Sequence, residues 1–147
     1  MWTYQNKPFT EIPEDVIAFV YLITNKINGK QYIGKKLFKF TRSTKQKGKR
    51  VKKQIDSDWQ DYYGSNEVLK KDIAEFGKDN FTRTIIHLCK SKGECSYLEA
   101  KEQFINGVIE SDDYYNTWIM VRVRDTHIKD YIERQKNAKG ISRSEES

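Results

Sequence analysis

Residues 19–34 read FVYLITNKINGKQYIG, and the fold of the chain is built around this stretch. An apolar, β-branched and aromatic run from Val16 to Thr24 predicts a buried strand. Asn28-Gly29 favours a tight type I′ hairpin turn, because both central residues of that turn have positive φ. Residues from Lys30 to about Phe38 are then expected to return as the antiparallel partner strand.

Each strand of this predicted hairpin carries one tyrosine. Alternation of side chains puts Tyr21 on the face of Phe19, and Tyr32 on the face of Gly34. Spacing does not fix the register, so the relative facing of the two phenols stays open. A phenol can orient a water or act as a general base where a nearby cation lowers its pKa. The alternative is that both tyrosines only pack the sheet.

The most basic part of the chain follows directly. Residues 35–53 contain ten Lys or Arg and no Asp or Glu, whereas the other 128 residues carry a net charge of about −4. Such a concentration of like charge favours a polyanionic partner such as nucleic acid, and docking of an acidic protein is the alternative. We expect residues 39–56 to be polar and mobile without a ligand. The expected nucleic-acid contacts are Lys36, Lys39, Lys45, Lys47, Lys49, Arg50, Lys52 and Lys53.

Periodicity downstream predicts alternating helices and strands. The expected elements are a helix over 65–77, a strand over 81–88, a helix over 92–110, a short strand or extended segment over 117–124 and a surface helix over 125–137. Ser65 is a plausible N-cap, and Ser91 with Glu94 fits a capping box. The predicted fold class is α+β, with a small three-stranded antiparallel sheet flanked by helices.

The same reading divides the chain into three parts. Residues 1–15 form an N-terminal extension, and residues 16–124 form the main domain with a basic insertion at 35–56. Residues 125–147 form a C-terminal helix and, from 138, a disordered tail. No apolar run approaches the roughly 18 residues needed to span a bilayer, and the N-terminus lacks a signal-peptide pattern, which together predict a cytoplasmic location without a membrane partner.

Few other residues offer chemistry. Glu99 lies between Leu98 and Ala100 in the predicted second helix, where one carboxylate could hold Mg²⁺ together with waters and a phosphate. A solvated, salt-bridged helix face is the alternative for Glu99. Arg42 could bind a phosphate bidentately, or be one more backbone-binding cation, and Lys35 could add charge to the same site.

Cysteine and histidine usage excludes two other classes of site. Cys89 and Cys95 do not have the spacing of a zinc motif, so buried, reduced thiols are expected. His87 and His127 lie far apart in the sequence and support neither a zinc site nor a histidine-based nuclease motif.

Together these features resemble the GIY-YIG nuclease family, and in particular phage-type homing endonucleases. The resemblance covers about residues 17–119. Phe19-Val20-Tyr21 keeps only the Tyr of the first motif, whereas Tyr32-Ile33-Gly34 matches the second completely. The family's arginine, metal-binding glutamate and downstream asparagine fall on Arg42, Glu99 and Asn116. The long basic insertion leaves Arg50 as an alternative to Arg42, and Gln46 stands where the family often has a histidine.

The resemblance implies a DNA endonuclease that cuts double-stranded DNA, using Mg²⁺ or Mn²⁺. Glu99 would be the metal ligand and Tyr21 the leading candidate for activating water, helped by Tyr32 and Lys35. Arg42 would stabilise charge on the phosphate, and Asn116 would support the site. For a phage-encoded protein, the place of action would be the host cytoplasm. A nucleic-acid-binding module of the same fold without catalysis is the alternative.

Overall fold

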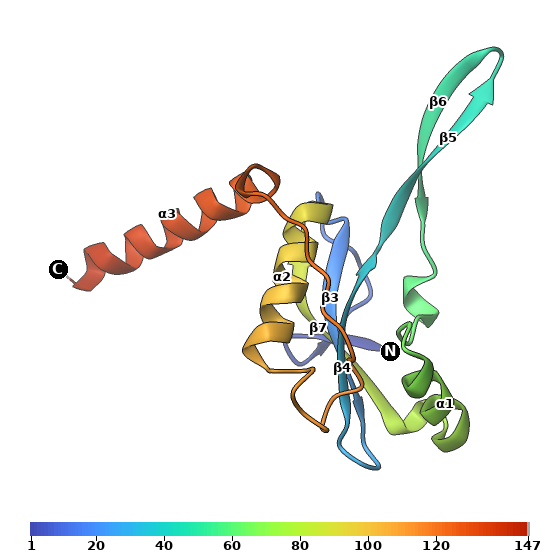
Figure 1. The fold of residues 1–147 in the computed structure, drawn as a ribbon. Coiled ribbons are helices and arrows are strands. Elements are labelled where there is room, and N and C mark those ends of the chain that lie inside the picture. Colours follow the sequence, from blue (N-terminus) through green and yellow to red (C-terminus); the bar gives the residue numbers. More distant parts are fainter. Residues whose placement is uncertain (147) are drawn as a thin grey trace.

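The computed structural model describes residues 1–146. Its strands are β1 (Trp2–Tyr4), β2 (Lys7–Pro8), β3 (Ala18–Asn25), β4 (Gln31–Leu37), β5 (Lys39–Gln46), β6 (Lys49–Asp56) and β7 (Phe81–Cys89). Its helices are α1 (Glu67–Phe76), α2 (Lys92–Ile105) and α3 (Lys129–Glu146), with short 3-10 helices η1 (Trp59–Asp61), η2 (Lys78–Asn80) and η3 (Asp125–Ile128). Helix α2 lies on one side of the central sheet, and α1 lies on the other (Figure 1).

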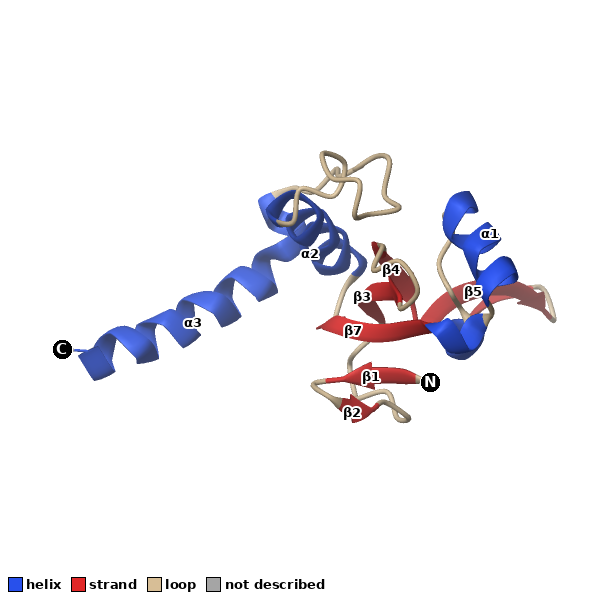
Figure 2. Ribbon diagram, turned by 90° about the horizontal axis from the view of Figure 1, so that it is seen from below, coloured by secondary structure: helices blue, strands red, loops and turns tan. Residues whose placement is uncertain are grey.

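The α+β class is confirmed, but the sheet has five strands where three were predicted. Its order is β2-β1-β7-β3-β4, so β7 is central, β3 lies between β7 and β4, and β4 lies at one edge. Strands β1 and β2 come from the expected N-terminal extension; β1 pairs with β7, and β2 pairs with β1 at the far edge (Figure 2). Buried Trp2 anchors β1, because its indole Nε1 donates to the Trp59 carbonyl at 2.7 Å. Pro8 is compatible with β2 because an outer strand does not need its N–H.

The turn of the first hairpin differs from the predicted one. Strands β3 and β4 pair antiparallel, as expected, but the loop between Asn25 and Lys30 has four residues. The Asn25 amide donates to the Lys30 carbonyl at 2.8 Å and closes this loop. Gly29 has φ +78°, whereas Asn28 is not in the positive region. Two-residue turns with both φ values positive occur instead at Gln5-Asn6 and at Lys47-Gly48.

The basic insertion is regular rather than irregular. Strands β5 and β6 pair through eight consecutive residue pairs, from Lys39 with Asp56 to Gln46 with Lys49. The resulting hairpin projects from the end of the domain as a separate two-stranded ribbon (Figure 1). Its alternating side chains are nearly all exposed, so no apolar periodicity marked the strands in the sequence.

Helix ends required smaller corrections. Asn66, not Ser65, caps α1, and its side-chain oxygen accepts from the Leu69 amide at 3.0 Å. Ser91 caps α2 as predicted, but α2 ends at Ile105 rather than near 110, followed by Gly107 at φ +57°. Residues 117–124 pair with no strand within the described part of the chain.

The C-terminal helix is longer than expected. Helix α3 continues to Glu146, whereas the sequence predicted a helix to 137 and a disordered tail over 138–147; Ser147 lies outside the described residues. Near its start, the Arg134 guanidinium donates to the buried Glu94 carboxylate of α2. Among residues 1–146, no helix has the length and apolar character that crossing a membrane requires.

The sheet separates two cores. Alternate residues of β3 point to opposite faces, so Phe19, Tyr21 and Ile23 pack toward α1 while Ala18 and Val20 pack toward α2. The first core is aromatic, with Phe19 and Phe38 ring centroids 4.4 Å apart and Trp59 set edge-on to Phe38 at 5.0 Å. These two cores hold the edge strand β4 between them, and the candidate site lies there.

Candidate active site

A cleft of about 310 Å³ lies along the outer edge of β4. It combines residues from both faces of the sheet, because β4 has no strand beyond it to separate them. Five of the six predicted catalytic residues line the cleft, and they are Tyr21, Tyr32, Lys35, Glu99 and Asn116. The structure therefore brings together residues that span 96 positions of the sequence, counted from 21 to 116.

The register places both tyrosines on one face. Tyr21 pairs with Gly34 and Ile23 with Tyr32, so the two phenol rings are diagonal neighbours with centroids 6.1 Å apart. Gly34 is required because the Tyr21 ring lies directly over it. A Cβ at Gly34 would come within 2.6 Å of Tyr21 Cζ. The Gly of the second motif thus makes room for the Tyr of the first.

The electrostatic setting keeps both phenols protonated in the metal-free protein. Burial raises the pKa of Tyr21 well above its ordinary value, and the neighbouring phenols of Tyr62 and Tyr32 raise it further. Burial also raises the pKa of Tyr32, although a hydrogen bond with Ser65 opposes this shift. At neutral pH these groups orient ligands as neutral phenols unless an added positive charge lowers their pKa.

Glu99 projects from α2 into the same cleft. Burial raises the pKa of its carboxyl from 4.5 to about 6, while the charge and backbone amide of Lys35 lower it. Lys35 is itself held to α2, since its Nζ donates to Ser96 Oγ at 2.7 Å. The positive charge of Lys35 therefore offsets only part of the effect of burial on the pKa of Glu99. A further cation beside this carboxylate would favour its charged form.

Asn116 closes the open edge of β4. Its side-chain Oδ1 accepts from the Ile33 amide at 3.1 Å, and its Nδ2 donates to the Ile33 carbonyl at 2.8 Å. Buried Gln103 of α2 donates to the same carbonyl at 3.0 Å. Asn116 thereby replaces a strand partner next to Gly34. Its geometry is that of a residue that positions the hairpin.

The donor set fits a single hydrated divalent cation. Within residues 1–146, no three His, Cys, Asp or Glu side chains gather in a group that could hold a metal ion. Mg²⁺ keeps several waters and is often held by one or two carboxylates plus substrate phosphate. One under-compensated carboxylate in a cleft open to substrate meets that requirement, with Glu99 as the ligand.

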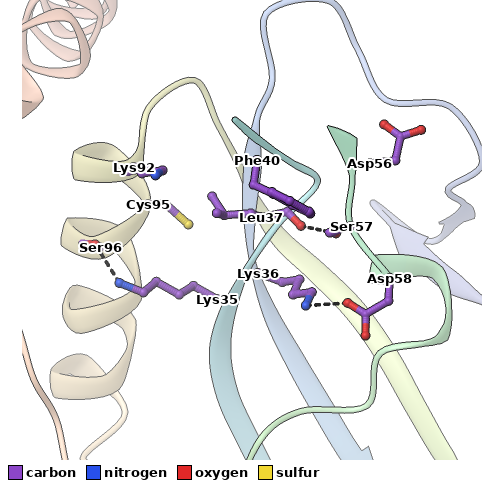
Figure 3. A pocket seen from close by; sticks show the side chains of 10 residues that line it. All are labelled: Lys35, Lys36, Leu37, Phe40, Asp56, Ser57, Asp58, Lys92, Cys95 and Ser96. Atoms are coloured by element: carbon purple, nitrogen blue, oxygen red, sulfur yellow. Dashed lines mark hydrogen bonds and ion pairs between the residues drawn. The ribbon is translucent and has the colours of Figure 1, made fainter. Parts of the chain in front are cut away.

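A second cleft, of about 730 Å³, adjoins the first at Lys35, which lines both. It lies between α2 and the base of the β5–β6 hairpin, with Lys92, Cys95 and Ser96 on one side and Phe40 on the other (Figure 3). Cys95 is buried, free and reduced, as is Cys89. The route from Glu99 to the hairpin thus passes through this second cleft.

Arg42 does not line the cleft at the edge of β4. It lies on the exposed part of β5, opposite Lys53, in the projecting hairpin. The alternative arginine, Arg50, lies closer to the hairpin tip, opposite Lys45. Arg42 shares a ribbon face with Phe40, which borders the second cleft. Neither arginine is next to Glu99 in this structure.

The predicted nucleic-acid-binding cations fall into two environments. Lys36 is engaged at the hairpin base, with its Nζ 2.7 Å from Asp58 Oδ1 and 4.2 Å from the Tyr62 ring centroid. The charge and hydrogen bond of Lys36 also lower the pKa of Asp58. The others lie on β5, β6 or the turn between them, and they are Lys39, Lys45, Lys47, Lys49, Arg50, Lys52 and Lys53.

The sequence did not identify three residues near the cleft: Tyr62, which packs against Tyr21, Arg83, which holds the segment of Tyr62, and Trp118. The Tyr62 ring stands edge-on to Tyr21 with centroids 5.9 Å apart. Arg83 fixes the Tyr62 segment, because its guanidinium donates to the carbonyls of Gln60 and Tyr62 at 2.9 and 2.8 Å. On the open side, Trp118 lines the cleft and is 66% exposed. An aromatic pattern with turn residues over 59–65 was visible in the sequence, but nothing linked it to Tyr21.

Comparison with known proteins identifies the class. The family model described as "Putative endonuclease segE, GIY-YIG domain" matches residues 2–119. The chain belongs to this GIY-YIG domain family, which confirms the resemblance found in the sequence. It is 36% identical over 99 residues to a phage protein, "Putative endonuclease segE" of Enterobacteria phage T4. That match covers 67% of this chain and 39% of the phage protein. No solved structure shows a significant match.

Proposed function

We propose that this protein is a divalent-metal-dependent DNA endonuclease that hydrolyses phosphodiester bonds, acting on duplex DNA in the host cytoplasm. The observation that supports this most directly is the convergence of Tyr21, Tyr32, Lys35 and Glu99 in one cleft at the edge of β4. The family assignment and the phage relative favour the same activity. Mg²⁺ is the proposed cation, with Mn²⁺ as a substitute.

In this proposal, Glu99 would hold the divalent cation through its carboxylate. A divalent cation held there would supply positive charge that binds the phosphate and lowers the pKa of nearby water and phenols. Lys35 adds positive charge beside the same carboxylate. Together these charges stabilise the extra negative charge that develops on phosphate oxygens during hydrolysis.

The phenols of Tyr21 and Tyr32 orient the attacking water. Their separation is fixed by the strand register and by the absence of a Cβ at Gly34. Tyr21 is proposed to accept the water proton as a phenolate, after its own proton has passed to solvent. This ionisation requires that positive charge in the cleft offset the raised pKa of the buried phenol. Asn116 is proposed to be a positioning residue. Its hydrogen bonds hold the backbone of Ile33 and thereby the position of the neighbouring Gly34.

Arg42 is proposed to bind substrate phosphate from the hairpin. Arg42 lies on the same face of the hairpin as Phe40, which borders the second cleft. DNA bound in the first cleft could extend past Lys35 into the second cleft and there meet Arg42. The position of Arg42 outside the catalytic cleft also favours a second candidate function, in which the same fold binds DNA without cleaving it.

A plasmid-nicking assay separates the two functions. The parent protein is incubated with supercoiled DNA and Mg²⁺, beside Glu99→Gln and the matched control Glu102→Gln. Glu102 lies on the same helix and pairs with His87 at 2.8 Å instead of lining the cleft. We expect nicking by the parent and by Glu102→Gln, with DNA binding but no nicking by Glu99→Gln. Binding without nicking by all three proteins, with Mg²⁺ and with Mn²⁺, would establish the binding module instead.

A further inference from the structure

The β5–β6 hairpin is a ribbon whose base is packed against the domain and whose remainder is exposed. At the base, Phe38 is fully buried, and its carbonyl accepts from the Ser57 amide at 2.8 Å. The ion pair between Lys36 and Asp58 closes the same end. Beyond Phe40 and Ile55, the residues of both strands are exposed. The hairpin is therefore held at a defined angle while both of its faces stay free (Figure 1).

Positive charge lies on both faces of this ribbon. Residues directly opposite each other in an antiparallel pair share a face, and the faces alternate along the strand. One face carries the pairs Lys45–Arg50 and Ser43–Lys52, and the other carries Arg42–Lys53 and Gln46–Lys49. A surface that lies flat on one phosphate backbone would need cations on one face only. Two cationic faces match a ligand with negative charge on both sides.

Repulsion within the ribbon points to the same class of ligand. Two cross-strand pairs, Arg42–Lys53 and Lys45–Arg50, set like charges directly opposite each other, an arrangement that destabilises a sheet. Only Lys39–Asp56, at the base, joins opposite charges across the two strands. A two-stranded hairpin is also marginally stable by itself in water. A polyanion bound along both faces would remove this repulsion and stabilise the paired strands.

We propose that the β5–β6 hairpin enters the major groove of duplex DNA, with its two cationic faces against the two phosphate backbones that border the groove. The inference rests on the proposed function and deepens it by naming the major groove as the surface that the hairpin binds. A ribbon with side chains on both faces is about 10 Å thick, by the spacing of stacked sheets. The major groove is roughly 12 Å wide and admits a two-stranded ribbon, whereas the minor groove is roughly 6 Å wide.

The length of the hairpin agrees with this placement. Eight residues per strand extend for about 27 Å, which is less than one helical turn of DNA at roughly 34 Å. The ribbon can thus occupy one stretch of groove without meeting a crossing backbone. Because its base lies beside Phe40 and Lys35, the groove contact is adjacent to the catalytic cleft.

The test removes equal charge from each face. In a Glu99→Gln background, which separates binding from cleavage, the affinity for a short duplex is measured against salt concentration. One variant carries Lys45→Gln and Lys52→Gln, and the other carries Lys49→Gln and Lys53→Gln. Each double variant is expected to reduce the slope of log K against log salt by about 1.8, and to weaken binding roughly 10–30-fold at 0.15 M salt. Lys7→Gln, on β2 at the far edge of the sheet, is the control and should leave the slope unchanged.

Two groove-specific dyes complete the test. Methyl green, which occupies the major groove, should compete with the protein, and netropsin, which occupies the minor groove, should not. A slope change for one face only, or competition by netropsin alone, would overturn the groove placement. Unchanged slopes for both double variants would show that the hairpin does not contact DNA, as expected if it docks an acidic protein.

The outcomes for this inference and for the proposed function are separable. Nicking by the parent with unchanged slopes in the hairpin variants would retain the nuclease and reject the ribbon. Slope changes on both faces without any nicking would retain the ribbon and reject the nuclease.

Discussion

The catalytic cleft and the basic hairpin are adjacent, yet they are organised by opposite principles. In the cleft, position is set by packing: Tyr21 is 1% exposed, lies over Gly34 and is surrounded by other aromatic rings. In the hairpin, many like charges project into water from two paired strands. The cleft contains few charges, and burial strengthens their effect on one another. The hairpin contains many charges, and solvent and salt weaken each of them.

This difference matches the two tasks that the proposed nuclease activity requires. Phosphodiester chemistry requires a few groups held within a fraction of an ångström, which only a packed scaffold provides. Attraction to DNA requires charge spread over a long surface, which tolerates imprecise placement. Substitutions in the cleft should therefore change the rate at saturating DNA, whereas substitutions in the hairpin should change affinity and its salt dependence.

The largest expected effect is on the cleft side. Replacing Glu99 by Gln should lower the nicking rate by at least about 10³-fold, because it removes the proposed cation ligand. Affinity for DNA should change little. Since burial disfavours the ionised carboxyl, the same variant should be more stable than the parent by about 1 kcal/mol at pH 8, after allowance for its partial exposure. Denaturant unfolding and single-turnover nicking measure both effects. Loss of stability together with activity would assign Glu99 a structural role.

The next effect isolates the hairpin. A variant in which Asn-Gly replaces residues 43–52 joins Arg42 to Lys53 through a short turn. We expect duplex affinity at 0.15 M salt to fall by at least about 100-fold, because five cations are lost. The melting temperature should stay close to that of the parent, since the deleted residues are exposed. A turnover rate near the parental value at saturating DNA would support the separation of tasks, and a lost rate would place the hairpin in the chemistry.

Gly34→Ala tests how closely the cleft is packed. The added Cβ would force the Tyr21 ring to move, with an expected cost of about 1–3 kcal/mol in stability and up to about 100-fold in rate. Val20→Ala is the matched control, because Val20 is a buried β3 residue on the opposite face of the sheet. Nicking by Val20→Ala should stay near the parental rate when both variants are folded. Equal losses in the two variants would point to instability alone.

The smallest effect comes from pH. Since the pKa of Glu99 is about 6, its ionisation should raise kcat/KM at low Mg²⁺ by about tenfold per pH unit below 6, and this contribution should level off above pH 6. The folded protein takes up this proton at higher pH than the unfolded chain does, with pKa values of about 6 and 4.5. The stability contributed by protonation is therefore present below pH 4.5 and lost as pH rises toward 6. The effect of pH on stability should be absent in Glu99→Gln.

The sequence predicted the strands of the first hairpin and the residues that line the cleft better than it predicted the rest. Residues 19–34 carry a strong local pattern, whereas Glu99 was identified through the resemblance to the family motifs. The register that pairs Tyr21 with Gly34 could not be predicted from the sequence and was seen only in the structure. Strand register depends on which faces are buried, and burial is set by contacts far apart in the chain. Strand β1 was missed because three residues are too few for a periodic signal; its evidence is a long-range contact, from Trp2 to Trp59.

The basic insertion was misjudged for a different reason. A polar, lysine-rich run shows no apolar periodicity, and the usual inference is an irregular loop. Strands β5 and β6 nevertheless alternate sides regularly, but both sides face water, so alternation leaves no trace in hydropathy. Lys47-Gly48 provided the better signal: a Gly in a two-residue turn between segments of equal length.

Asn116 has a consequence beyond the site it supports. The outer edge of a sheet is a template on which another chain can add a strand, and such addition leads to domain swapping or fibre formation. Here the side-chain amide of Asn116 accepts a hydrogen bond from the backbone N–H of Ile33 and donates one to its C=O, on that edge. The residue that steadies the catalytic hairpin thus also keeps copies of this protein from joining edge to edge at high concentration.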